Sequence, residues 1–123
     1  MEVLTIRTTS QTPIYQQLFE QISMQILNGE LESDTPLPSI RAMAKELRVS
    51  IITIKKTWEL LERDNFIYTV AGKGSYVEKN SKKFLEKRKL KTVKEALKQN
   101  IELSKQMHIS KDELIKIIIE LYE

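Results

Sequence analysis

The chain has 123 residues, with 20 Lys and Arg, 17 Asp and Glu, one His and no Cys, which suits one compact domain or a small domain with an appendage. The absence of Cys excludes a disulfide framework and a Cys/His zinc site, and the longest uninterrupted apolar run, three residues, excludes a transmembrane helix. Residues 1–30 lack the basic start and apolar stretch of a signal peptide, so we expect a soluble cytosolic protein whose net charge of +3 says little about its partners.

The first predicted helix begins at Thr12-Pro13, because Pro is favoured in the first helical turn. Apolar residues recur every four positions and form one stripe, at Ile14, Leu18, Ile22 and Ile26. Asn28-Gly29 ends the helix, since Gly suits a left-handed C-terminal cap. A loop rich in Ser, Asp and Pro follows over residues 32–38.

Two further helices are predicted close together. Ser39 is the expected N-cap of a short second helix, which breaks at Arg48-Val49. Ser50 can cap a third helix, over about residues 50–64, whose buried stripe includes Ile54, Trp58 and Leu61. Two helices joined by about four residues form a helix-turn-helix.

A two-stranded hairpin is predicted next. Residues 66–70 are β-branched and aromatic, Ala71-Gly72-Lys73-Gly74 suits a tight turn, and residues 75–77 form the returning strand. A hairpin placed after a helix-turn-helix is a wing. We therefore expect residues 1–78 to form a winged helix-turn-helix domain in a mainly α (α+β) fold. Winged helices also bind proteins, so the fold alone leaves the function open.

Residues 79–123 are predicted to form a helical tail. A long helix covers about residues 84–106, and a capping box at Ser110–Glu113 begins the last helix after a break at residues 107–109. The last helix is apolar around nearly its whole circumference, which one partner helix cannot cover. A second copy of the chain is the simplest cover, so we expect a homodimer. The expected interface residues are Val93, Leu97, Ile101, Leu114, Ile117, Ile118 and Leu121.

The charge is segregated along the chain. Residues 1–79 carry 9 Lys and Arg against 10 Asp and Glu, yet residues 39–56 carry five basic residues against Glu46 alone. Such a basic island favours a nucleic-acid partner. The run 82–98 holds eight basic residues against two acidic ones. It is either a solvated face that keeps a dimer soluble or an electrostatic aid to DNA association.

Several motifs follow one another in order between Pro13 and Val77. They are Pro13-Ile14-Tyr15, Ile26-Leu27-Asn28-Gly29-Glu30-Leu31, Leu37-Pro38-Ser39-Ile40-Arg41, Ala44-Lys45-Glu46-Leu47, Val49-Ser50, Thr53-Ile54-Lys55-Lys56, Leu60-Leu61-Glu62-Arg63 and Gly72-Lys73-Gly74-Ser75-Tyr76-Val77. In this order and spacing they closely resemble the DNA-binding domain of the GntR family of bacterial transcription regulators. The short helical tail resembles the YtrA-type subfamily, in which two-helix tails serve dimerisation.

The first turns of the third helix are expected in the major groove, and the resemblance adds the start of the second helix and the wing. The expected DNA-binding residues are Ser39, Arg41, Ser50, Ile51, Ile52, Thr53, Lys55, Lys56, Gly72, Lys73 and Gly74. Alternatives stay open for several of them. Arg41 could form an ion pair with Glu46, Thr53 could serve only the helix start, and Lys56 could be solvated. The two glycines could supply only positive φ angles to the turn.

Three departures from the family pattern concern the same surface. Ser33-Asp34 replaces the usual Pro-Gly, so the loop turn can differ. Val70 and Ala71 stand where basic residues are common in the wing. Ile51 and Ile52 stand where polar, Pro or Arg residues are usual, and they could contact thymine methyl groups.

The function that the sequence favours is that of a homodimeric repressor that binds double-stranded DNA at an inverted-repeat operator. The alternative is a winged-helix protein-interaction module that does not bind DNA. An enzyme is excluded, because no nucleophile–His–acid set exists and Gly72-Lys73-Gly74 lies between two strands. No cofactor or metal is expected, since His108 has no ligand partner. No effector or effector pocket is identified.

Overall fold

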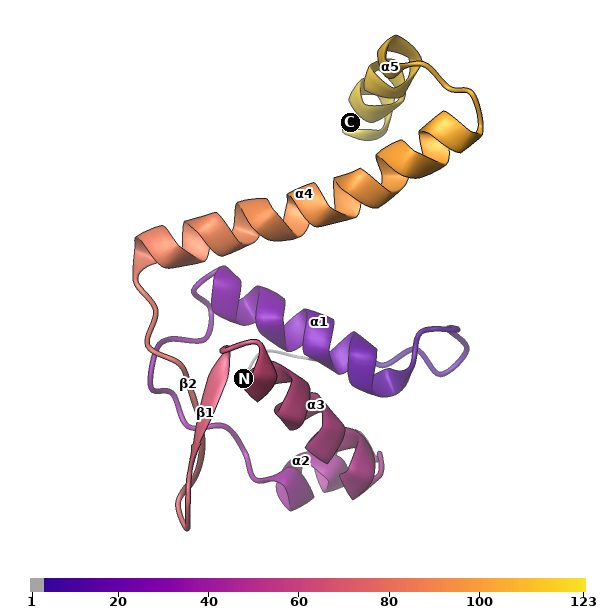
Figure 1. Ribbon diagram of the computed structural model, residues 1–123. Helices are drawn as coiled ribbons and strands as arrows, with labels where there is room; N and C mark the ends of the chain where they lie inside the picture. Colours follow the sequence, from indigo (N-terminus) through magenta and orange to yellow (C-terminus); the bar gives the residue numbers. More distant parts are fainter. Residues whose placement is uncertain (1–3) are drawn as a thin grey trace. The chain divides into compact units, whose positions relative to one another are not determined.

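The computed structural model describes residues 4–123, which fall into two compact units (Figure 1). One unit ends at Leu85 and the other is Glu86–Glu123. The elements in chain order are α1 (Ile14–Leu27), α2 (Ile40–Leu47), α3 (Ile51–Arg63), β1 (Ile67–Val70), β2 (Gly74–Val77), α4 (Lys82–Gln106) and α5 (Lys111–Leu121). This order confirms the predicted winged helix-turn-helix followed by two helices.

The predicted helix caps are present. The hydroxyl of Ser39 accepts a hydrogen bond from the Ala42 N–H at 3.1 Å, and the hydroxyl of Ser50 accepts one from the Thr53 N–H at the same distance. Ser110 and Glu113 form a reciprocal capping box at the start of α5. Between α2 and α3, Arg48 has a left-handed φ of 58°, so the tight turn is made without a glycine. These local hydrogen bonds fix where α2 and α3 begin.

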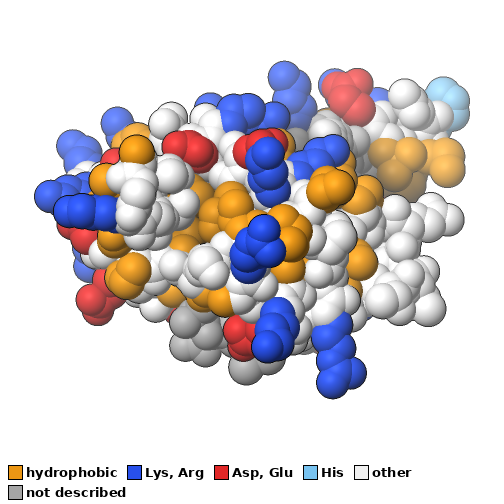
Figure 2. Space-filling view, turned by 90° about the horizontal axis from the view of Figure 1, so that it is seen from below, with side chains coloured by type: hydrophobic (Ala, Val, Ile, Leu, Met, Phe, Trp, Pro, Cys, Tyr) orange, Lys and Arg blue, Asp and Glu red, His pale blue; other side chains and the backbone are white. Residues whose placement is uncertain are grey.

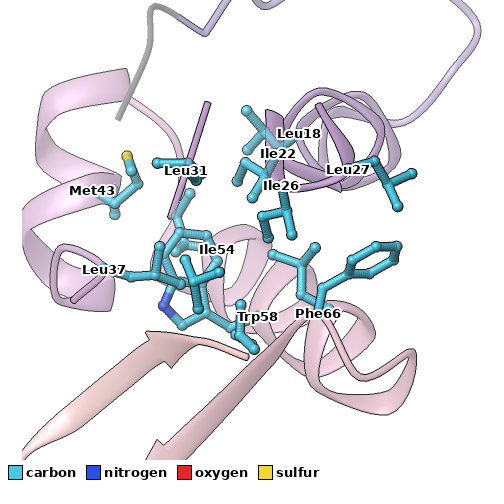
Figure 3. Packing of buried hydrophobic residues seen from close by; sticks show 14 residues of the cluster. Leu18, Ile22, Ile26, Leu27, Leu31, Leu37, Met43, Ile54, Trp58 and Phe66 are labelled. Carbon is cyan, nitrogen blue, oxygen red and sulfur yellow. The ribbon is translucent and has the colours of Figure 1, made fainter. Parts of the chain in front are cut away.

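The core of the winged-helix unit lies between α1, α3 and the base of the hairpin (Figure 3). Leu18 and Ile22 of α1 and Ile54 and Leu61 of α3 are completely buried. Trp58 packs in the same cluster, as the sequence predicts. The unit therefore buries its apolar stripes within a single chain.

The hairpin is antiparallel, with Ile67 opposite Val77 and Val70 opposite Gly74. A segment preceding α2 pairs with the other edge of β2. The Leu37 N–H donates to the Ser75 carbonyl at 2.9 Å, and the Val77 N–H donates to the Thr35 carbonyl at 2.9 Å. These long-range bonds attach the wing to the loop that leads into α2.

The tail unit has a different character. The helix α4 begins two residues before the predicted start, because the Ser81 hydroxyl accepts a hydrogen bond from the Phe84 N–H at 3.1 Å. The only buried side chain of α4 is Ser104, and α5 has none. No helix in residues 4–123 is long and apolar enough to cross a membrane.

Candidate nucleic-acid interface

Three parts of the winged-helix unit lie on one side of it. Figure 1 shows α2, the N-terminal end of α3 and the turn between β1 and β2 at the lower side of the view. Figure 2 looks at the molecule from that side, and Lys and Arg side chains are spread around patches of hydrophobic side chains there. The fold therefore places on one face the three segments that the sequence assigns to DNA contact, which chain order alone does not do.

The first turn of α3 is held by two hydroxyl groups. The Ser50 and Thr53 oxygens are 2.8 Å apart and share a hydrogen bond, while the Ser50 oxygen also accepts from the Thr53 N–H. The helix-start role considered for Thr53 is thus present in the free protein. Thr53 also accepts, through its carbonyl, a hydrogen bond of 2.9 Å from the Thr57 hydroxyl.

The adjacent apolar pair Ile51 and Ile52 faces solvent. Ile52 is 78% exposed and Ile51 is 44% exposed. The opposite side of α3 is the core stripe, which contains Ile54, Thr57, Trp58 and Leu61. Because successive residues of an α-helix are about 100° apart, Ile52 lies nearly opposite the centre of that stripe. Ile52 is therefore directed away from the protein, while Ile51 lies between it and the core stripe.

The helix-turn-helix that carries this pair also carries five cations. Arg41, Lys45 and Arg48 come from α2 and its C-cap, while Lys55 and Lys56 come from α3, and all five are exposed. In residues 4–123, no ion pair within 4 Å joins Arg41 to Glu46 or another acid, so the alternative role of Arg41 is absent from this structure.

Lys56 is not simply solvated. Its ammonium nitrogen lies 4.1 Å from the centroid of the Tyr15 ring, within the range of a cation–π interaction. Tyr15 itself is only partly buried. The ring therefore holds Lys56 at the border between α1 and α3 while leaving its charge at the surface.

The wing tip contains two glycines with positive φ angles, 77° at Gly72 and 118° at Gly74. No atom lies within 4 Å of a Cβ added at either position, so backbone conformation rather than crowding requires glycine in the free protein. The Lys73 N–H closes the turn on the Val70 carbonyl at 3.0 Å, and its side chain is exposed. The conformational reading of the glycines is thus sufficient in the free state.

A wing support is present that the sequence interpretation missed. The Tyr68 hydroxyl of β1 donates to a carboxylate oxygen of Asp34 at 2.7 Å, and the Tyr68 ring stacks on Tyr76 with centroids 5.5 Å apart. The hydrogen bond to this carboxylate raises the pKa of Tyr68 to about 12. The Lys79 ammonium lies 3.7 Å from the other carboxylate oxygen.

The sequence feature that could have indicated the Asp34–Tyr68 hydrogen bond is Ser33-Asp34, which replaces the usual Pro-Gly of the family. Asp34 adopts a φ of 64°, the left-handed conformation that a glycine takes easily, and Asp tolerates it better than most residues. The Asp34 side chain adds a carboxylate to this turn. The Asp34 N–H also donates to the Val77 carbonyl at 2.7 Å. Asp34 therefore joins the loop before α2 to both strands of the wing.

The predicted dimer residues lie in the tail unit. Val93, Leu97 and Ile101 are exposed on α4. On α5, Ile117, Ile118 and Leu121 are exposed and Leu114 is half-buried. Within one chain, six of the seven predicted interface residues are thus exposed and one is half-buried, so their apolar surface is available to a partner.

Comparison with known proteins shows which family the chain resembles. The family described as bacterial regulatory proteins, gntR family, matches residues 14–77. HTH-type transcriptional repressor YtrA of Bacillus subtilis (strain 168) is 35% identical over 99 residues, which cover 80% of this chain and 76% of YtrA. The similarity to YtrA thus extends beyond the winged helix.

Two solved structures add to this. A GntR family transcriptional regulator from Listeria monocytogenes has a TM-score of 0.76 and 29% identity, covering 90% of this chain and 96% of that one. AraR(DBD) in complex with operator ORX1 has a TM-score of 0.53 and 32% identity, covering 63% of this chain and 95% of that one.

Proposed function

This chain belongs to the GntR family of bacterial regulatory proteins and is of the YtrA type, and from that premise we propose that it is a homodimeric repressor that recognises an inverted-repeat operator. That it is a DNA-binding transcription regulator and not an enzyme follows from the family. The dimer, the symmetric operator and the contact residues form the proposal. We place its action in the cytoplasm, where a bacterial regulator meets chromosomal DNA.

One observation carries the DNA-binding mode. The N-terminal end of α3 is exposed, apolar at its centre and surrounded by cations, and it lies on the same side as α2 and the wing (Figures 1 and 2). In helix-turn-helix proteins the N-terminal residues of the recognition helix contact base edges. Glu59 and Glu62 are exposed farther along α3, where they would repel phosphates if the whole helix lay along the groove. End-on insertion of the first two turns therefore fits the charges best.

Each proposed contact has a role. Arg41 and Lys55 form no ion pair within residues 4–123, and they can neutralise phosphates or donate to base edges. Lys56 is restrained by Tyr15 and is assigned to the phosphate backbone at the border of the surface. Ser39, Ser50 and Thr53 present helix starts, at which backbone N–H groups favour a phosphate. Gly72, Lys73 and Gly74 form a narrow wing tip that suits the adjacent minor groove.

The dimer follows from the tail. The helix α5 has six Leu and Ile residues in its 11 positions, and no residue of it is buried in one chain. Pairing two tails around a two-fold axis would cover these side chains with their own equivalents. The same axis would relate two winged-helix units, and such a pair recognises two half-sites of opposite orientation.

The test is selection of DNA from a random pool by the full chain, followed by a hydroxyl-radical footprint on the enriched sequence. The proposal predicts two protected patches related by a dyad. Enrichment of no sequence, in a preparation that is folded, would favour the protein-interaction module instead. A footprint with one patch would remove the symmetric operator from the proposal.

A further inference from the structure

We propose that Ile52, with Ile51 beside it, recognises the 5-methyl groups of thymines in the major groove, so that the operator half-site holds thymine under the first turn of α3. This inference rests on the proposed function and specifies what that surface selects. It commits the most exposed large hydrophobic side chain of α3 to apolar contact with bases.

The exposure of Ile52 is unusual for the unit in which it lies. Among the large hydrophobic side chains described up to Leu85, Ile52 is the most exposed at 78%, ahead of Met24, Ile51, Phe84 and Val70. The apolar stripe of α3, formed by Ile54, Trp58 and Leu61, is buried in the core on the other side of the helix. Ile52 contributes little to that core, so its position is free to serve a partner.

The charge around the pair identifies the kind of partner. Arg41, Lys45, Arg48 and Lys55 are exposed on α2, the following turn and α3. An occupant of this surface has to be anionic and yet offer an apolar group at its centre. The thymine methyl is the apolar group on the major-groove edges of the four base pairs, and it lies between two phosphate chains. DNA therefore complements both features together.

The first turn of α3 has few side-chain groups that can form hydrogen bonds with bases. Isoleucine has no donor or acceptor in its side chain. The Ser50 and Thr53 hydroxyls already bond to each other at 2.8 Å, and the Ser50 oxygen also accepts the Thr53 N–H. The bond between the hydroxyls uses one of their two hydrogens, so few donors remain in this turn and apolar contact is the larger part of what it offers to bases. Arg41 and Lys55 supply further donors.

The experiment edits the methyl group alone. Binding of the full chain is measured by fluorescence anisotropy on the selected operator, and then on duplexes in which half-site thymines are replaced by deoxyuridine. Each methyl that Ile52 contacts is expected to contribute a loss of about threefold to fourfold in affinity. In a second set of duplexes, cytosine replaces the same thymine and should lower the affinity. 5-Methylcytosine at that position should restore part of the lost affinity, because it returns the methyl group.

Two variants assign the effect to the side chain. Ile52→Ala should lose most of the difference in affinity between thymine and deoxyuridine duplexes. Met24→Ala removes another exposed apolar side chain, on α1, and should keep the full sensitivity to deoxyuridine. Circular dichroism of both variants checks that the fold is intact.

Two outcomes would overturn the inference, and they are distinguishable. If wild-type protein binds its operator but treats thymine and deoxyuridine alike at every half-site position, the methyl recognition is wrong while the proposed function stands. If folded wild-type protein binds no DNA in the selection, the proposed function fails and the inference fails with it.

Discussion

The two units of this chain bury their apolar side chains in different ways. In the winged-helix unit, Leu18, Ile22, Ile54 and Leu61 are completely buried by other parts of the same unit. In the tail unit, α5 is richer in Leu and Ile than α3, yet none of its residues is buried. Hydrophobicity alone therefore does not indicate which side chains form a core within one chain.

This difference in burial supports the two roles that we propose, DNA binding for the winged-helix unit and dimerisation for the tail unit. The winged-helix unit buries its own apolar stripes, so its exposed surface is available for DNA. The tail unit lacks an interior of its own, so its apolar surface is available for a second chain. The basic residues are also distributed differently. Five of the nine Lys and Arg residues in residues 1–79 lie at positions 39–56, while α4 carries basic residues over much of its length.

The largest expected effect comes from the tail. Ile118→Asp places a charge in the proposed interface and should convert the dimer to a monomer. Because two linked half-site contacts bind far more tightly than one, DNA affinity should fall roughly 100-fold or more. Analytical ultracentrifugation and anisotropy measure the two changes, and Lys116→Asp on the same helix is the matched control. A monomeric wild-type protein, or a variant that still dimerises, would refute the assignment of α5.

The winged-helix core provides the second effect. Ile54 is completely buried, so Ile54→Ala should lower the free energy of unfolding of this unit by about 2–5 kcal/mol. Ile52→Ala, two residues away and exposed, should change it by less than about 0.5 kcal/mol. Chemical denaturation followed by Trp58 fluorescence measures both. Equal losses in the two variants would contradict the burial pattern of α3.

Removing cations should weaken DNA binding more in the winged-helix unit than in α4. Arg41→Ala and Lys55→Ala should each lower operator affinity roughly tenfold, and the loss of a phosphate contact should reduce the slope of log affinity against log salt by about 1. Reversing the charge of Lys87, Lys91 and Lys94 on α4 should have an effect of only about threefold, because distant exposed charges are screened. A larger loss from α4 would move the main electrostatic contact to the tail.

The smallest effect concerns the wing support. The pKa of Tyr68 is raised to about 12 from an ordinary value of 10 by its hydrogen bond to Asp34, so folding favours the neutral phenol. Its contribution to stability is complete below pH 10 and is lost as the pH rises toward 12. A tyrosinate absorbance titration should show one of the four tyrosines ionising late, and Asp34→Asn should bring it back toward 10. An unchanged titration in the variant would remove Asp34 as the cause.

Much of the fold was predictable because its signals are local. Ser39, Ser50 and Ser110 mark helix starts through hydrogen bonds to N–H groups only three residues ahead. The start of α4 was missed because Ser81 precedes a run of lysines that resembles a linker, although Ser81 caps the helix in the same way. Such errors of two residues leave the architecture unchanged.

The supports of the candidate site were less predictable because they join residues far apart in sequence. The hydrogen bond between Asp34 and Tyr68 spans 34 positions, and the Lys56–Tyr15 contact spans two helices. No periodicity or capping pattern in the sequence predicts either of these two contacts. The exposed pair Ile51 and Ile52, by contrast, could be recognised from the sequence as misplaced apolar residues, and the structure supplies their exposure.

In the proposed assembly, the winged-helix unit contacts DNA through α2, α3 and the wing while the tail pairs two copies. Native mass spectrometry of the full chain with its selected operator duplex tests this most directly, with the wild type and Ile118→Asp measured side by side. The account predicts two chains per duplex for the wild type, and for Ile118→Asp a weak complex with one chain. One chain per duplex for the wild type, or two for Ile118→Asp at unchanged affinity, would contradict it.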